Sequence, residues 1–102
     1  MIFFKSYETD HGTVLAMCDE ELIGRVLRRG KLVIDLDKYA AFYKGELLSE
    51  EEASERVGKE KIYSANVVGE RSIRIVVERG LAEASDVTSA EGVPFVQIYV
   101  MV

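Results

Sequence analysis

Two strand–turn–strand patterns stand near the two ends of the chain, and together they demand an antiparallel sheet. Near the start, the apolar and aromatic residues 2–7 and the apolar run 13–17 flank Thr9-Asp10-His11-Gly12, whose Asp and Gly suit a tight turn. Residues 87–90 and 94–100 repeat the pattern around a Glu-Gly pair. The last of these segments is apolar on both faces, so we expect a central strand or a strand covered by a partner.

The residues between the hairpins predict helices and a middle strand. Asp19 is a candidate N-cap for a helix that ends at Gly30, and residues 31–37 alternate like a third strand. The spacing of Ser49 and Glu52 is that of a capping box, which predicts a helix to about residue 57. The apolar stripe of the first helix consists of Leu22, Ile23, Val26 and Leu27.

Residues 66–80 fit two secondary structures. A helix would place Val68, Ile75 and Val76 near one face and end at Gly80, whereas a strand would use the alternation of β-branched residues. We favour the helix because a run of this length is long for a strand.

These elements predict an α+β fold in one domain, residues 1–102. We expect a mainly antiparallel sheet of about five strands, built from the two hairpins and the middle strand, with two or three helices on one face. The longest apolar stretches are too short to span a bilayer, and the first residues lack the pattern of a secretory signal. The single cysteine cannot form an internal disulfide, which favours a cytoplasmic location.

Four segments, in order and at similar spacing over nearly the whole chain, resemble the archaeal domain-of-unknown-function family 424. The resemblance implies an archaeal, cytoplasmic, single-domain protein without an assigned activity. The segments are Ala16-Met17-Cys18-Asp19-Glu20-Glu21-Leu22-Ile23-Gly24, Phe42-Tyr43-Lys44-Gly45-Glu46-Leu47-Leu48-Ser49-Glu50-Glu51-Glu52-Ala53, Ala65-Asn66-Val67-Val68-Gly69-Glu70-Arg71 and Gly92-Val93-Pro94.

Cys18 is the first candidate for chemistry, because a thiol at a strand end beside a helix start is a common place for reactive cysteines. Three acidic residues follow it, and negative charge raises the pKa of a thiol. The lone histidine, His11, is predicted about 23 Å away along the strand, too far to act as its base. A buried structural cysteine is therefore the favoured interpretation. With one Cys and one His, we expect no zinc site, and no nucleotide-binding motif indicates a cofactor.

The segment from Asn66 to Arg71 is the leading candidate for binding. Asn66, Gly69, Glu70 and Arg71 combine polar groups with a glycine at a predicted helix start, where free amides could meet an anion or a partner's backbone. The structural alternative is that Asn66 caps the helix and Gly69 permits close packing.

One basic cluster, Arg25, Arg28, Arg29 and Lys31, interrupts a chain whose net charge is −5. That charge argues against binding nucleic acid over the whole surface, but it leaves room for a local contact with RNA phosphates or an acidic protein. Aromatic residues nearby could stack on unpaired bases if they are exposed, and otherwise belong to the core. They are Tyr39, Phe42 and Tyr43.

Two classes of function therefore stay open. The first is a non-enzymatic binding or interaction module, an accessory of RNA or translation machinery, that uses the basic cluster and the Asn66–Arg71 segment. The second is a small enzyme or redox-responsive protein that uses Cys18 with Asp19 or Glu70. A homodimer through residues 94–102 is compatible with both, since a strand that is apolar on two faces needs cover.

Overall fold

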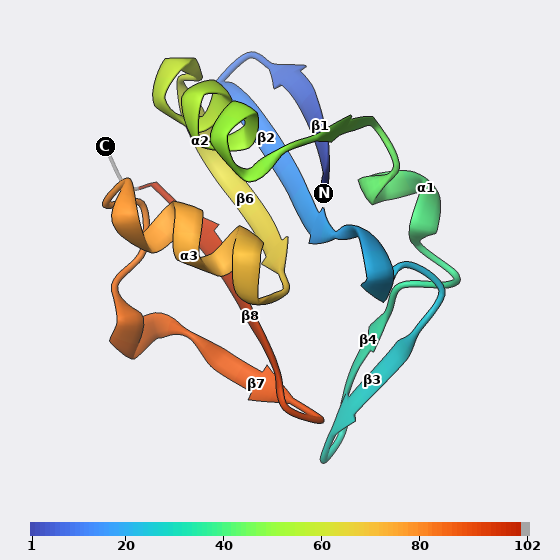
Figure 1. The fold of residues 1–102 in the computed structure, drawn as a ribbon. Helices are drawn as coiled ribbons and strands as arrows, with labels where there is room; N and C mark the ends of the chain where they lie inside the picture. Colours follow the sequence, from blue (N-terminus) through green and yellow to red (C-terminus); the bar gives the residue numbers. More distant parts are fainter. Residues whose placement is uncertain (101–102) are drawn as a thin grey trace.

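A six-stranded sheet forms the centre of the protein, in the strand order β5-β1-β2-β6-β8-β7 (Figure 1). A computed structural model describes residues 1–100. The strands of the central sheet are β1 (Ile2–Thr9), β2 (Gly12–Asp19), β5 (Glu46–Leu48), β6 (Ile62–Val68), β7 (Thr88–Ala90) and β8 (Val93–Tyr99). A separate two-stranded sheet holds β3 (Val26–Arg29) and β4 (Leu32–Asp35). The helices are α1 (Ala40–Tyr43), α2 (Glu50–Lys59) and α3 (Glu70–Glu78), with short 3₁₀ turns η1 (Glu20–Leu22) and η2 (Ala84–Asp86).

The α+β class and both terminal hairpins are confirmed. β1 pairs with β2 in an antiparallel register that closes at Thr9 and Gly12, and β7 pairs with β8 around Glu91 and Gly92. β6 pairs in parallel with β2 and antiparallel with β8, so it joins the two hairpins into one sheet. β6 therefore takes the middle place that the sequence had assigned to residues 31–37, and β5 adds an edge strand to the expected five.

The predicted helix from Asp19 to Gly30 is wrong. η1 makes a single turn, Gly24 follows with φ +96°, and the chain then enters the β3–β4 hairpin. Leu27 is buried while Val26 and Arg28 on either side are exposed, so the local period is that of a strand. Gly30, expected to end a helix, instead turns the hairpin with φ +58°.

The segment 66–80 divides between the two predicted alternatives. Residues up to Val68 continue β6, and α3 begins at Glu70 with Gly69 as its N-cap. The helix prediction is therefore correct from Glu70 and wrong for Asn66, which lies within the sheet and caps no helix. The two valines at 67 and 68 are buried between neighbouring strands, where β-branched side chains pack well.

Each face of the sheet has its own core. α2 and α3 cover the first face, and their apolar side chains pack on alternate sheet residues such as Leu15, Met17 and Val67. The second face holds Ala16, Cys18 and Val68 and is partly covered by the β3–β4 hairpin, η1 and α1. The expectation of helices on one face holds for α2 and α3, while the hairpin supplies most of the unexpected cover on the other. Within residues 1–100, no helix has the length and apolar character needed to cross a membrane.

The predicted capping box of α2 is present in full. The Ser49 hydroxyl accepts the Glu52 amide at 3.1 Å, and the Glu52 carboxylate accepts the Ser49 amide at 3.1 Å. Hydrogen bonding of the Glu52 carboxylate, first to the Ser49 backbone amide and then to the Ser49 side chain, holds the pKa of Glu52 below its ordinary value.

Ser49→Ala should lower the free energy of unfolding by about 1 kcal/mol, because one amide in the first turn of α2 loses its acceptor. Urea unfolding followed by circular dichroism measures the change. Ser85→Ala, at an exposed serine in η2, is the control and should stay close to wild type. Equal stability of the two variants would contradict this account of the cap.

Candidate functional site

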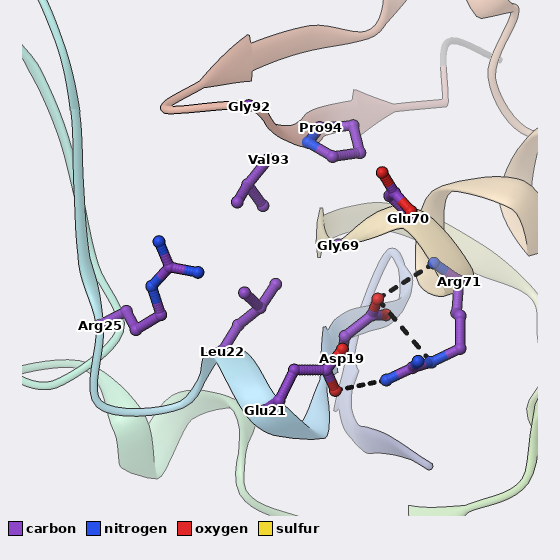
Figure 2. Close-up of a pocket in the computed structure, with 10 residues that line it drawn as sticks. All are labelled: Asp19, Glu21, Leu22, Arg25, Gly69, Glu70, Arg71, Gly92, Val93 and Pro94. Atoms are coloured by element: carbon purple, nitrogen blue, oxygen red, sulfur yellow. Dashed lines mark hydrogen bonds and ion pairs between the residues drawn. The ribbon is translucent and has the colours of Figure 1, made fainter.

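The candidate residues fall into two separate places. A pocket of about 230 Å³ at the ends of β2 and β6 brings together five of them (Figure 2). We call it the strand-end pocket. Its lining residues are Asp19, Glu21, Leu22, Arg25, Gly69, Glu70, Arg71, Gly92, Val93 and Pro94.

The carboxylate of Asp19 is the centre of the strand-end pocket. It is 3% exposed, and it accepts hydrogen bonds from the Arg71 amide at 3.0 Å, the Ser72 amide at 2.9 Å and the Ser72 hydroxyl at 2.8 Å. The prediction that Asp19 caps a helix running to Gly30 is therefore wrong: its side chain makes no cap bond there, and it binds the first turn of α3, more than 50 residues further along the chain. At the start of α3, where free amides could have met an external anion, those of Arg71 and Ser72 are bound by this internal carboxylate.

Gly69 fits closely beneath Asp19. It has φ +110°, and a Cβ built on it would overlap the carboxyl carbon of Asp19 and lie 2.6 Å from its Oδ2. The Gly69 amide donates to the Pro94 carbonyl at 2.8 Å. Both its conformation and its space therefore require glycine, which supports the close-packing role suggested by the sequence.

Arg71 connects the buried carboxylate to the surface. Its guanidinium forms an ion pair with Glu21, and its Nε lies 3.9 Å from Asp19 Oδ2. Burial opposes the charge on Arg71, but the nearby Asp19 and Glu21 outweigh it and raise its pKa. Arg25 and Glu70 are exposed at the rim, on opposite sides of the pocket (Figure 2).

Cys18 and Asp19 are neighbours in sequence that face opposite sides of the sheet. The Cys18 side chain is buried with Ala16 and Val68 on the second face, whereas Asp19 reaches α3 on the first. Burial, followed by the charges of Asp19 and Glu21, raises the pKa of Cys18 to about 12. Its thiol is therefore protonated at neutral pH. The imidazole of His11 stacks on Tyr63 at 5.3 Å, near the other end of β2.

The second place is a groove of about 430 Å³ between the β3–β4 hairpin and the second face of the sheet. We call it the aromatic groove. Asn66 forms its floor, and its Oδ1 accepts a hydrogen bond from Gln97 Nε2 at 3.1 Å. Tyr43 is buried, which raises its pKa to about 12, while Tyr39 is 56% exposed. The lining residues are Val33, Ile34, Asp35, Leu36, Tyr39, Phe42, Tyr43 and Asn66.

Three of the four residues of the basic cluster lie on the β3–β4 hairpin, whose strand β4 borders the aromatic groove, and Arg25 lies at the strand-end pocket. Their charges are therefore not those of a helix end. Arg28 and Arg29 are exposed on β3, and Lys31 is exposed at the turn. The hairpin leans on the β7–β8 turn, because the Arg28 amide donates to Glu91 at 2.7 Å and Arg29 donates to the Ser89 carbonyl at 3.2 Å.

The sequence did not single out every residue that matters here. Ser72 and Glu21 complete the contacts of Asp19 and Arg71, and Gln97 orients Asn66. The structure identifies these three residues because each one bonds a residue that is distant in the sequence. Within residues 1–100, no cluster of three or more His, Cys, Asp and Glu side chains has an arrangement that could hold a metal ion.

A model of the family described as Protein of unknown function (DUF424) matches residues 7–101. The chain belongs to this family. The chain is also similar to a solved structure, described as the crystal structure of an uncharacterized conserved protein from Methanopyrus kandleri, with 28% sequence identity and a TM-score of 0.81. That match covers 98% of this chain and 91% of the other. A search of curated proteins finds no match.

The resemblance to DUF424 proteins that the sequence indicated is therefore confirmed. Three of the four segments that carried it meet at the strand-end pocket, through Asp19, Gly69 and Pro94. The archaeal source of the solved relative agrees with the archaeal origin that the resemblance implies.

Gly69→Ala should cost about 2 to 4 kcal/mol of folding free energy, because it adds both backbone strain and overlap with Asp19. Gly24→Ala is the matched control, since Gly24 has φ +96° but a Cβ there meets nothing within 4 Å. Denaturant unfolding of both variants measures the difference. If Gly69→Ala costs no more than Gly24→Ala, the close contact with Asp19 does not constrain the fold.

The buried thiol predicts a loss of stability at high pH. Above pH 9 the unfolded chain loses the Cys18 proton while the folded chain keeps it, so the free energy of unfolding falls as pH rises towards 12. The slope from this one group is at most about 1.4 kcal/mol per pH unit. Urea unfolding of wild type and Cys18→Ala at increasing pH measures it. The difference in free energy of unfolding between wild type and Cys18→Ala should become smaller above pH 9. A constant difference would contradict a buried, protonated thiol.

Proposed function

We propose that this protein is a non-enzymatic module that binds single-stranded RNA in the aromatic groove, with the β3–β4 hairpin contacting phosphates. A cytoplasmic role as an accessory of RNA or translation machinery is part of this proposal. The observation that carries it is that an exposed tyrosine and an oriented amide line one groove, and that the hairpin bordering this groove carries exposed basic residues on its other strand and at its turn, in an otherwise acidic protein.

The distribution of charge supports a contact of the hairpin with phosphates. Residues 25–44, which form the hairpin and α1, contain six Lys or Arg and two Asp, a net charge of +4 in a chain whose net charge is −5. The remaining residues therefore carry −9. A polyanion would be repelled by the acidic body and attracted at the hairpin, which would direct it to the groove.

The lining of the groove supports recognition of bases. Tyr39 presents an exposed ring, and the Lys38 ammonium lies 5.5 Å from the centre of that ring. A base stacked on Tyr39 would therefore place its phosphate beside a cation. Asn66 offers an amide that Gln97 holds in place, and amides bond the edges of unstacked bases. The volume of the aromatic groove is in the range of pockets that hold small ligands.

The alternative of an enzyme or redox-responsive protein has less support. Cys18 is buried with a raised pKa, and the alternation of β2 separates it from Asp19. Glu70 lies exposed at the strand-end pocket. These positions do not assemble a nucleophile with a base.

Tyr39→Ala should weaken binding of a fluorescein-labelled single-stranded RNA by about tenfold or more, since stacking on an aromatic ring contributes about 1 to 3 kcal/mol per base. Arg28→Ala should weaken binding and make the plot of log affinity against log salt shallower by about 0.7, the value for one lost phosphate contact. Fluorescence anisotropy over a range of salt concentrations measures both effects.

Two matched variants lie outside the groove. Tyr63→Ala removes an exposed tyrosine at the β1–β2 end of the sheet, and Arg74→Ala removes an exposed arginine on α3. Both should bind RNA like wild type. Absence of salt-dependent binding by wild type, or equal losses in the control variants, would refute the proposal.

A further inference from the structure

The outer edge of β8 is partly unpaired. β7 pairs only with Val93, Pro94 and Phe95 of β8, so the strand continues past the end of its neighbour (Figure 1). On the other side β6 pairs with β8 as far as Tyr99. The sequence predicted that this strand is central or covered, and that is correct for its first half.

Two backbone hydrogen bonds fix which backbone groups of β8 face outward. The Val100 amide donates to the Tyr63 carbonyl at 2.9 Å, and the Pro94 carbonyl accepts the Gly69 amide at 2.8 Å. Even-numbered residues of β8 therefore turn their backbone groups towards β6. The odd-numbered residues face the other way, so the N–H and C=O groups of Gln97 and Tyr99 point away from the sheet beyond the end of β7.

This free edge lacks the features that usually protect an edge strand. Residues 93–100 carry no charge, and the proline stands at position 94, where β7 already pairs. Tyr99 is 64% exposed and Val100 is 36% exposed. A groove of about 540 Å³ runs beside the edge, between the strand and the loop that carries Leu81, Ala82 and Asp86.

We propose that β8 pairs with β8 of a second copy of this chain, antiparallel and around a twofold axis at Ile98. A second copy fits because the uncharged strand meets its equal without opposing like charges, although the chain as a whole is acidic. In this register Gln97 lies opposite the second copy's Tyr99, so the outward backbone groups of both residues form four hydrogen bonds across the axis. The inference is independent of RNA binding.

Other registers use the edge less well. An axis at Gln97 would pair Phe95 with the second copy's Tyr99, but the outward groups of Phe95 already face Thr88 of β7. The wider strand expected for a dimer, 94–102, includes residues 101 and 102, which lie outside the described part of the chain. Among residues 95–100, the axis at Ile98 leaves β7 in place and uses both free residues.

The oligomeric state of the full chain tests this inference. Wild type should have twice the 11.4 kDa mass of one chain in size-exclusion chromatography with light scattering. Tyr99→Lys should weaken the dimer at least about tenfold, because each of the two paired β8 strands would then carry a positive charge at the interface. Tyr63→Lys, at an exposed tyrosine of β6, should leave the dimer intact. A monomeric wild type, or a dimer that Tyr99→Lys does not weaken, would overturn the proposal.

Engineered cysteines test the register. Ile98→Cys should form a disulfide between two copies on mild oxidation, because Ile98 would face itself in a pair without hydrogen bonds. Val100→Cys should not, because Val100 would lie opposite the second copy's Val96. Circular dichroism verifies that both variants remain folded. Cross-linking through Val100→Cys in place of Ile98→Cys would overturn the register at Ile98.

Discussion

The buried carboxylate of Asp19 is the interaction on which the arrangement of this protein depends. It stands at the end of β2 and accepts two amides and one hydroxyl from the start of α3, so it fixes the angle at which the helix leaves the sheet. Gly69 must remain without a side chain for this contact to form. A carboxylate buried to this extent would be costly without these donors, and the donors would be unsatisfied without the carboxylate. Neither partner is formed locally, because more than 50 residues separate them in the chain. The first turn of α3 therefore gains its cap from tertiary structure, which brings the end of β2 beside it.

This long-range cap also explains why the sequence indicated some features and misled on others. The hairpins at both ends, the capping box at Ser49 and the family were predicted correctly, because each has a local signature. Asp19 was predicted to cap the helix that follows it, and that prediction is wrong, because its side chain bonds the distant α3. Residues 19–30 resemble a helix in sequence, because acidic residues come first, a short apolar stripe follows and basic residues precede Gly30. Burial of Leu27 against the sheet nevertheless favours a strand. That choice depends on tertiary packing, which a local pattern does not contain.

The sequence identified candidate residues by their chemistry, but it did not predict where in the fold they lie. Asn66 and Arg71 belong to one short segment, yet the turn from β6 into α3 sends Asn66 to the aromatic groove and Arg71 to the strand-end pocket. Cys18 and Asp19 are separated in the same way by the alternation of β2. Residues that are neighbours in the sequence therefore lie on different faces of the sheet or in different pockets of the folded protein. The strand-end pocket is explained largely by the stabilisation of α3, which leaves the aromatic groove as the better place for a ligand.

The attachment of the β3–β4 hairpin has a consequence for motion. The hairpin shares no strand ladder with the six-stranded sheet, and its register consists of four residue pairs. Its tip is held to the β7–β8 turn by contacts of exposed residues, Arg28 with Glu91 and Arg29 with Ser89. Local opening of this unit breaks no strand pair of the six-stranded sheet, although it exposes Leu27, which is fully buried in the second core. Its amides should therefore exchange with solvent by a route of lower free energy than those of β2 and β6. Outward movement of the hairpin would widen the aromatic groove without breaking a strand pair of the central sheet, and its cost would be exposure of the second core.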